Sequence, residues 1–381
     1  MMVGIRSDKI ITVKGIFDGY IYFDEDKIVS VTKDRMKSDG EYDLTGKYVS
    51  PGFIDIHTHG GAGFDFINGY DDVVDGSNFH LSYGTTSILP TISAAPFKKM
   101  AKAIEEIDRV KRDGSAKANI IGAHLEGPYL SKEQCGAQCT DFITNPKKEE
   151  YEELINKYPH AIARWSYAPE NDPKGEFASF LKKNGIIASA GHTNAIYDDM
   201  KVALDNGMNL ITHLFSCTST ITRDMGFRRL GVIESAFLED EIFVEIIADG
   251  KHLPPDLIKL ILKIKGTDKV ALITDSLSVA GTEQKEGKMV DTEYVIEDGV
   301  CKLKDRSAFA GSIATADRLV RVMKDEVGIS IESAVKMMSE VPAGILNVPK
   351  GIIKEGYDAD IIAFDENINV SDVWVMGKKQ K

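Results

Sequence analysis

Two histidines separated by one residue, His57 and His59, end an apolar run in the segment PGFIDIHTHGG at residues 51–61. In a β-strand, side chains two residues apart point to the same face. If this run is a strand, the two imidazoles leave its C-terminal end side by side. Such a pair can share a metal ion, or it can simply form hydrogen bonds at the strand end.

Other apolar runs also end in residues of the metal-binding type. Glu126 ends the third run, His192 the fifth, His213 the sixth and Asp275 the eighth. A single histidine at a strand end is usually only hydrogen-bonded, and an aspartate there often caps a helix. Because such residues end five different runs, the sequence favours a shared metal site over five separate explanations.

The runs that carry these residues alternate with stretches of helical spacing. Eight short apolar runs, each followed by such a stretch, are typical of a (β/α)8 TIM-type barrel, whose catalytic residues gather at the C-terminal ends of the strands. An open doubly wound sheet is the alternative, but no glycine-rich phosphate loop follows the first run. The runs cover residues 47–57, 85–91, 119–126, 163–169, 186–192, 210–215, 243–250 and 270–275.

The two ends of the chain have a different pattern. Residues 8–49 and 351–377 contain short strand-like runs separated by acidic or glycine-containing turns. We therefore predict a small β-sandwich domain built from both chain ends, residues 1–50 and 345–381, with the barrel at residues 51–344 inserted between them.

Composition limits the partners and the location. The formal net charge of −13 argues against non-specific binding to nucleic acid or to an anionic membrane. No apolar run approaches the ~20 residues of a membrane span, and the N-terminus has no signal-peptide core. Four cysteines in 381 residues are too few for a disulfide scaffold, so we expect a cytoplasmic protein with free thiols.

The candidate ligands indicate a reaction class. Imidazole and carboxylate suit zinc, iron, manganese or cobalt better than magnesium or calcium. A bound divalent metal lowers the pKa of water to about 7, and the two oxygens of Glu126 allow it to bridge two ions. Asp275, beside that water, is placed to take its proton and pass it to a leaving amine. The sequence thus predicts hydrolysis of an amide or a related C–N bond.

The remaining histidines carry weaker expectations. His124, two residues before Glu126, is a candidate partner that orients a metal ligand. His252 follows the seventh run and is placed to meet a substrate. His80 and His160 lie in polar, helical surroundings, and we expect both at the surface.

The sequence resembles the amidohydrolase superfamily along its whole length, and within it the deacetylases of phosphorylated N-acetyl amino sugars. The resemblance implies removal of an N-acetyl group, with N-acetylglucosamine 6-phosphate as the leading substrate and glucosamine 6-phosphate and acetate as products. The motifs that carry it are PGFIDIHTHG, HLEGPYLS, SAGHTNA, THLF, IIADGKH, LITDSLSVAG, FAGSIATAD and GYDADIIAFD.

This resemblance also implies roles for the residues already singled out. One or two divalent ions are expected, with zinc or iron foremost and manganese or cobalt as alternatives. Asp275 matches the general acid and base, and His252 matches a substrate contact. The main metal matches Glu126, His192 and His213, and a second metal, which some members lack, matches His57 and His59.

Departures from the family pattern all concern substrate recognition. Gln138, in CGAQ, stands where the family has a histidine that holds the substrate carbonyl, and an amide can still donate there. Ser216 and Cys217 replace an Asn-Ala pair of the sugar phosphate pocket. Arg228, in RRLG, matches the phosphate-binding arginine, and two neighbours, Arg223 and Arg229, compete for this role. The resemblance further implies a homodimer in which a neighbour lends a pocket residue.

The same residues leave other functions open. The substrate alternatives are N-acetylgalactosamine 6-phosphate, an amino sugar without phosphate, or another cyclic or acyl amide. Dihydroorotase-like members often bridge their ions with a lysine on the fourth strand, and the run ARWSYAPE contains none. An inactive scaffold on this fold should have lost ligands, whereas every ligand position is filled here.

Overall fold

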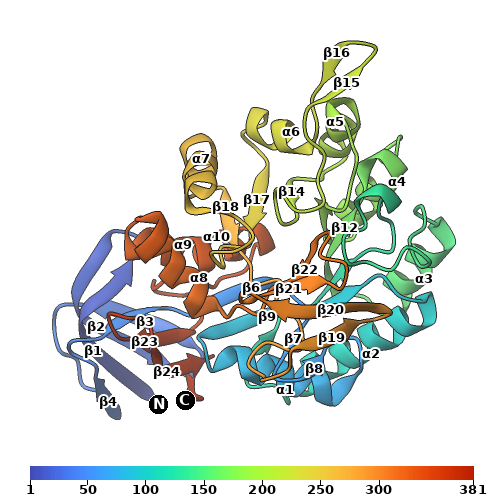
Figure 1. Cartoon of the computed structure of the whole chain (residues 1–381). Coiled ribbons are helices and arrows are strands. Elements are labelled where there is room, and N and C mark those ends of the chain that lie inside the picture. The colour runs from blue at the N-terminus through green and yellow to red at the C-terminus, as the bar shows by residue number, and fades with distance from the viewer.

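The computed structural model describes residues 1–381 and contains a parallel β-sheet that curves into a barrel (Figure 1). Neighbouring strands pair in chain order, with β6 on β9 and β17 on β18 at the two ends of the path. The predicted barrel is confirmed. Its strands are β6 (Phe53–Thr58), β9 (Thr85–Ser93), β10 (Asn119–Ile120), β11 (Ala123–Glu126), β12 (Ile162–Tyr167), β13 (Ile187–Ala190), β14 (Leu210–Ile211), β17 (Phe243–Ile246) and β18 (Val270–Leu272).

The first and last barrel strands meet through a short set of hydrogen bonds rather than a long ladder. The Asp275 amide donates to the His57 carbonyl at 2.9 Å. Beside it, the Thr274 hydroxyl donates to the buried Asp55 carboxylate at 2.5 Å. The seam between β6 and β18 therefore places Asp275 next to the His57 and His59 pair.

Helices alternate with the barrel strands and bury one face against the outer surface of the barrel. In α2, the buried residues recur at the helical period, from Met100 through Ile104 and Ile107, and Gly114 ends the helix with a positive φ of 64°. The helices are α1 (Tyr70–Leu81), α2 (Phe97–Asp113), α3 (Lys148–Lys157), α4 (Glu176–Lys183), α5 (Tyr197–Asp205), α6 (Val232–Leu238), α7 (Pro255–Lys265), α8 (Ala316–Val322), α9 (Ile331–Met338) and α10 (Glu340–Leu346), with a π-helical turn at Met323–Val327.

Strands from both chain ends form one further sheet, which holds both termini (Figure 1). This small β-rich unit agrees with the prediction, although its strands are hydrogen-bonded as one continuous sheet. Strand β1 bulges after Ser7, so that its first half pairs with β4 and its second half with β5. The strands are β1 (Met2–Thr12), β2 (Gly15–Asp24), β3 (Lys27–Thr32), β4 (Gly40–Asp43), β5 (Tyr48–Pro51), β23 (Ile361–Phe364), β24 (Val370–Val375) and β25 (Lys378–Lys379).

Three insertions at the barrel mouth complete the fold. A four-stranded antiparallel sheet lies between β18 and α8, and a short hairpin joins His59 to α1. A third insertion is a hairpin that projects beyond the helices at the top of Figure 1. No helix has the length and apolar character needed to cross a membrane. The strands of the three insertions are β7 (Gly60–Gly61), β8 (Phe64–Asp65), β15 (Thr222–Asp224), β16 (Phe227–Arg229), β19 (Glu286–Met289), β20 (Thr292–Glu297), β21 (Val300–Leu303) and β22 (Phe309–Gly311).

Candidate active site

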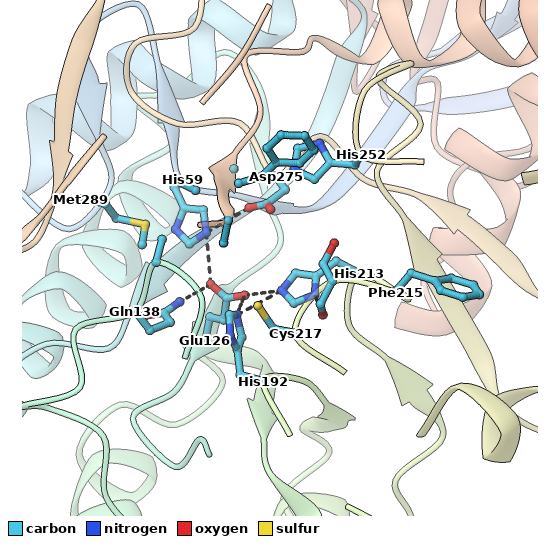
Figure 2. A pocket seen from close by; sticks show the side chains of 16 residues that line it. His59, Glu126, Gln138, His192, His213, Phe215, Cys217, His252, Asp275 and Met289 are labelled. Carbon is cyan, nitrogen blue, oxygen red and sulfur yellow. Dashed lines mark hydrogen bonds and ion pairs between the residues drawn. The ribbon is translucent and has the colours of Figure 1, made fainter. Parts of the chain in front are cut away.

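A cavity of about 240 Å³ opens at the C-terminal ends of the barrel strands (Figure 2). The barrel supplies its polar floor, and the inserted sheet supplies much of its apolar wall. The lining residues are His59, Glu126, Ala137, Gln138, His192, His213, Phe215, Ser216, Cys217, His252, Asp275, Met289, Ala308, Phe309, Ala310 and Gly311.

The Glu126 carboxylate is the centre of this floor, as Figure 2 shows. Its Oε1 lies 2.9 Å from the Nε2 of His213 and 3.1 Å from the Nε2 of His192. The same oxygen is 3.4 Å from the Nε2 of His57, and Oε2 is 3.2 Å from the Nε2 of His59. Four imidazoles from three barrel strands thus converge on one buried carboxylate.

The outer nitrogens of two of these rings show how the inner nitrogens are protonated. The Nδ1 of His192 is 2.9 Å from the Gln134 carbonyl, and that of His213 is 3.1 Å from the Ser216 carbonyl. A carbonyl only accepts, so each Nδ1 carries a proton, and Nε2 is the nitrogen that can offer a lone pair to a metal. The two Nε2 atoms are only 3.2 Å apart, beside the Glu126 carboxylate. A cation between these lone pairs removes the repulsion, so the three residues fit a metal ion.

A second donor set adjoins the first. His57, His59 and Asp275 place one donor atom each within 4.8 Å of one another, as do Glu126, His192 and His213. The Oδ1 of Asp275 is 3.5 Å from the Nε2 of His57 and 3.3 Å from that of His59. Both ring nitrogens of His57 are buried without a hydrogen-bond partner. Because an unpartnered buried nitrogen costs free energy, the second set also fits a metal ion.

Backbone strain is concentrated at these strand ends. The φ angles are 48° at His192, 30° at His213 and 46° at Asp275, all in the left-handed region. Non-glycine residues rarely adopt this conformation, and where they do so the surrounding structure must hold them in it. The strain turns three side chains from the ends of the strands toward the cavity.

The charges of the site balance within the protein. Burial disfavours the charged imidazoles, but Glu126 and Asp275 outweigh it and raise the pKa of His57 to about 9 and that of His59 to about 10. Burial would likewise raise the pKa of each carboxyl, but the imidazoles hold both below their ordinary values. Burial opposes the charged form of His192 as well, but Cys217 and Glu126 hold the pKa of His192 well above its ordinary value. At neutral pH, imidazolium groups therefore face the two carboxylates.

Most of the predicted substrate contacts lie in the cavity wall. Gln138 accepts from the Ala94 amide at 2.8 Å and donates to Glu126 at 2.7 Å, so its amide nitrogen faces the metal donors. His252 donates from Nδ1 to Asp249 at 2.9 Å, which leaves Nε2 for the cavity. Ser216 and Cys217 also line the cavity.

The three arginines are not brought into the cavity of their own chain. Arg223, Arg228 and Arg229 lie on the exposed β15–β16 hairpin, and none lines the cavity. Arg228 donates to the Gly226 carbonyl at 3.2 Å, and Arg229 pairs with Asp224 at 3.2 Å. The hairpin carries them away from the barrel because its strands pair only with each other.

Of the two histidines predicted to lie at the surface, the structure places one there and buries the other. His160 is exposed, as predicted. The prediction of a surface position for His80 is wrong, since this side chain is fully buried. It lies on the inner face of α1 and contacts the Gly60 carbonyl at 2.9 Å. The spacing of Val73 and Leu81 around His80 is the signal that marks this face as buried.

Beneath the donors lies a polar layer, of which the sequence patterns indicated only His124. His124 lies there, with Nε2 at 2.7 Å from the Ser166 hydroxyl and its ring 4.6 Å from that of His57. Arg164 and Glu245 form a fully buried ion pair in the same layer. No local motif distinguishes these two residues from ordinary polar positions in a strand.

A (β/α)8 barrel with adjoining sets of imidazole and carboxylate donors at its C-terminal rim defines a class of metal-dependent hydrolases. The chain belongs to the amidohydrolase family, whose sequence profile matches residues 48–379. The resemblance read from the sequence motifs is thereby confirmed.

Individual relatives refine this placement. The chain is 33% identical to N-acetylglucosamine-6-phosphate deacetylase of Lysinibacillus sphaericus, over 85% of this chain and 83% of the relative. It is 27% identical to N-acetylgalactosamine-6-phosphate deacetylase of Escherichia coli O157:H7, over 98% of both chains. Its structure matches a mutant N-acetyl-D-glucosamine-6-phosphate deacetylase of Mycobacterium smegmatis, solved in complex with N-acetyl-D-glucosamine-6-phosphate, with a TM-score of 0.91, 25% identity and 99% coverage of both chains.

Metal binding should release protons and weaken in acid. Because the pKa values of His57 and His59 lie near 9 and 10, both rings are protonated at pH 7 and must lose a proton to bind a metal. We expect about two ions per chain, with the His57/His59 ion releasing roughly two protons and binding about 100-fold more weakly for each unit that the pH falls. Calorimetric titration of metal-free protein with Zn²⁺, between about pH 6 and pH 8 in buffers of different ionisation enthalpy, measures both. A single ion per chain at metal excess, or affinity independent of pH, would contradict this expectation.

Proposed function

We propose that this chain removes the N-acetyl group of N-acetylglucosamine 6-phosphate and releases acetate and glucosamine 6-phosphate. The observation that carries the proposal is the convergence of Glu126, His192, His213 and Asp275 in one cavity at the barrel mouth. The deacetylase names of the relatives support the substrate class. We further propose that the enzyme acts in the reducing cytoplasm.

Two donor sets are assigned to the metals. Zinc or iron suits these nitrogen and oxygen donors best, and manganese or cobalt also fits them. Bound here, a divalent ion would supply water with a pKa near 7 and a Lewis acid for the amide carbonyl. Glu126, His192 and His213 would hold the main ion, and His57, His59 and Asp275 would hold a second one.

Asp275 is assigned to proton transfer. The surrounding imidazoles overcome the effect of burial and lower its pKa, so the carboxylate is ionised and ready to accept a proton. As the water oxygen bonds to the acetyl carbon, Asp275 takes the proton from that water. It then gives the proton to the amide nitrogen as the C–N bond breaks, which leaves acetate and a free amine.

Gln138 and His252 are assigned to the substrate. Because the Ala94 amide fixes the Gln138 oxygen, the amide nitrogen keeps one N–H beyond its bond to Glu126. We assign this N–H to the substrate carbonyl or a neighbouring polar group. His252, held through Nδ1 by Asp249, presents Nε2 from the opposite wall of the cavity. Ser216 and Cys217 are assigned to the walls of the sugar phosphate pocket.

The phosphate site is assigned to a homodimer. The β15–β16 hairpin carries exposed apolar side chains, with Met225 90% and Phe227 72% exposed. Apolar groups and arginines on a projecting element are typical of a protein interface. A second copy of this chain would cover the apolar groups and bring Arg228, or its neighbours Arg223 and Arg229, toward the other cavity. An arginine fork suits a phosphate dianion.

An acetate-release assay over a panel of sugars tests the proposal. The panel contains N-acetylglucosamine, N-acetylgalactosamine and N-acetylmannosamine, each with and without a 6-phosphate. We expect the highest kcat/KM for N-acetylglucosamine 6-phosphate. Preference for N-acetylgalactosamine 6-phosphate would favour the function named for the relative that matches over 98% of both chains. Absence of acetate release from every sugar would refute the proposal.

Replacing Asp275 should separate chemistry from folding. Asp275→Asn keeps the shape of the side chain but removes the base, so kcat should fall by at least about 10²- to 10⁴-fold. The ion held by Glu126, His192 and His213 should remain. Asp172 offers a control, because this buried carboxylate accepts from the Phe177 and Ala178 amides at the start of α4, outside the cavity. Asp172→Asn should lower the melting temperature and leave kcat unchanged. An Asp275→Asn variant with kcat within a few-fold of the parent would end the assignment.

The hairpin assignment predicts complementation between two impaired variants. Arg228→Ala should raise KM for the phosphosugar about 30- to 150-fold and leave turnover of the unphosphorylated sugar nearly unchanged. Mixed dimers of Arg228→Ala and Asp275→Asn chains should regain activity, because one cavity then has both an intact Asp275 and an intact arginine from its neighbour. Equal losses on both sugars, or failure of exchanged mixtures to regain activity, would contradict the assignment. An effect carried instead by Arg223→Ala or Arg229→Ala would move the role to that residue.

A further inference from the structure

The barrel interior beneath the active site contains a charged pair that the proposed chemistry does not use. Arg164 on β12 and Glu245 on β17 are both fully buried. The Nη2 of Arg164 lies 2.8 Å from the Oε2 of Glu245, and Nη1 donates to Oε1. The pair is therefore bidentate and fixed in orientation.

Arg164 is held on all sides. Its Nε donates to the Ser189 hydroxyl at 3.1 Å, Nη1 to the Ile56 carbonyl at 3.1 Å and Nη2 to the Thr212 hydroxyl at 2.9 Å. Together with the two bonds to Glu245, these contacts use all five N–H donors of the guanidinium. Arg164 thus holds the Glu245 carboxylate without rotational freedom.

Stability alone does not account for this pair. The desolvation cost of a fully buried ion pair offsets much of its attraction, and apolar residues of similar volume often serve a core equally well. The interior of such barrels is usually filled by branched apolar side chains. A charged pair at this position therefore calls for a role in the site above it.

The position of Glu245 beside His57, at ion-pair distance, indicates that role. Its Oε2 lies 3.7 Å from the Nδ1 of His57, whose Nε2 faces Glu126 and Asp275. The other three imidazoles around Glu126 have an uncharged oxygen near Nδ1, which is the Ser93 hydroxyl for His59 and a carbonyl for His192 and His213. Among these four rings, His57 alone has a carboxylate there. A carboxylate behind a metal-binding imidazole fixes its tautomer and strengthens Nε2 as a donor.

We propose that Glu245, held by Arg164, is the positioning residue that keeps the proton of His57 on Nδ1 and its lone pair on Nε2. The pair thereby determines how tightly the His57/His59/Asp275 set binds its ion. This inference rests on the two-ion form of the proposed function. It assigns no direct contact between Glu245 and the substrate.

Titration of metal-free protein with Zn²⁺ or Co²⁺ tests the inference without any substrate. Glu245→Gln should weaken the second ion about 10- to 100-fold and leave the affinity of the Glu126/His192/His213 ion within a few-fold of the parent. The Co²⁺ absorption spectrum should lose the contribution of the second ion over the same range. Glu106 on α2, which pairs with Lys102 and Arg109 outside the barrel, gives a matched control. Glu106→Gln should bind both ions as the parent does.

A second variant covers the case in which the unpaired Arg164 prevents folding. Arg164→Met with Glu245→Leu removes both charges, so this double variant should fold and still bind the second ion weakly. Parental affinity for the second ion in either variant would overturn the inference, as would equal weakening of both ions. A parent that binds only one ion would also overturn it. The acetate-release panel measures deacetylation separately, so that outcome leaves the enzymatic proposal standing.

Discussion

The Glu126 carboxylate imposes the constraint on which the rest of the site depends. It is buried among four imidazole rings, with its oxygens 2.9–3.4 Å from their Nε2 atoms. Charge in such a place must be balanced by charge or by a bound ion. The metal-free protein achieves this with imidazolium groups, and a bound divalent ion would replace their protons. The same carboxylate thus explains the clustering of histidines, the raised pKa values and the fit to metal.

The barrel meets this constraint by using rigid parts of the fold. His57 and Glu126 lie within strands, and His192, His213 and Asp275 follow strands in strained left-handed conformations. Hydrogen bonds to backbone carbonyls fix the outer nitrogens of His192 and His213. Beneath them, buried polar residues replace part of the usual apolar filling, so the donors are held from below as well as from the sides. Such support favours a site that keeps its geometry when protons and ions exchange.

The sequence predicted those features of the structure that depend on residues close together along the chain, and it did not predict contacts between distant residues. Strand periodicity placed the barrel strands and their chemical end residues correctly, because register and face are local properties. The structure brings the predicted donors together, since parallel strands end at one rim. The partner of an inward side chain is not a local property, so the Arg164–Glu245 pair was missed. His80 was misassigned because the polar residues around it hid the buried face of α1.

Recognition of the substrate depends on different parts of the chain from the chemistry. The metal donors come from the strand ends, whereas Gln138, Cys217 and Phe309 come from loops and from the inserted sheet. The arginines lie on a hairpin whose two strands pair only with each other. Every departure from the family pattern falls in these outer segments. Because loops change without disturbing the strands that they join, the sugar and its phosphate can vary while the donors stay fixed. This separation allows one donor geometry to serve the same chemistry on either sugar epimer.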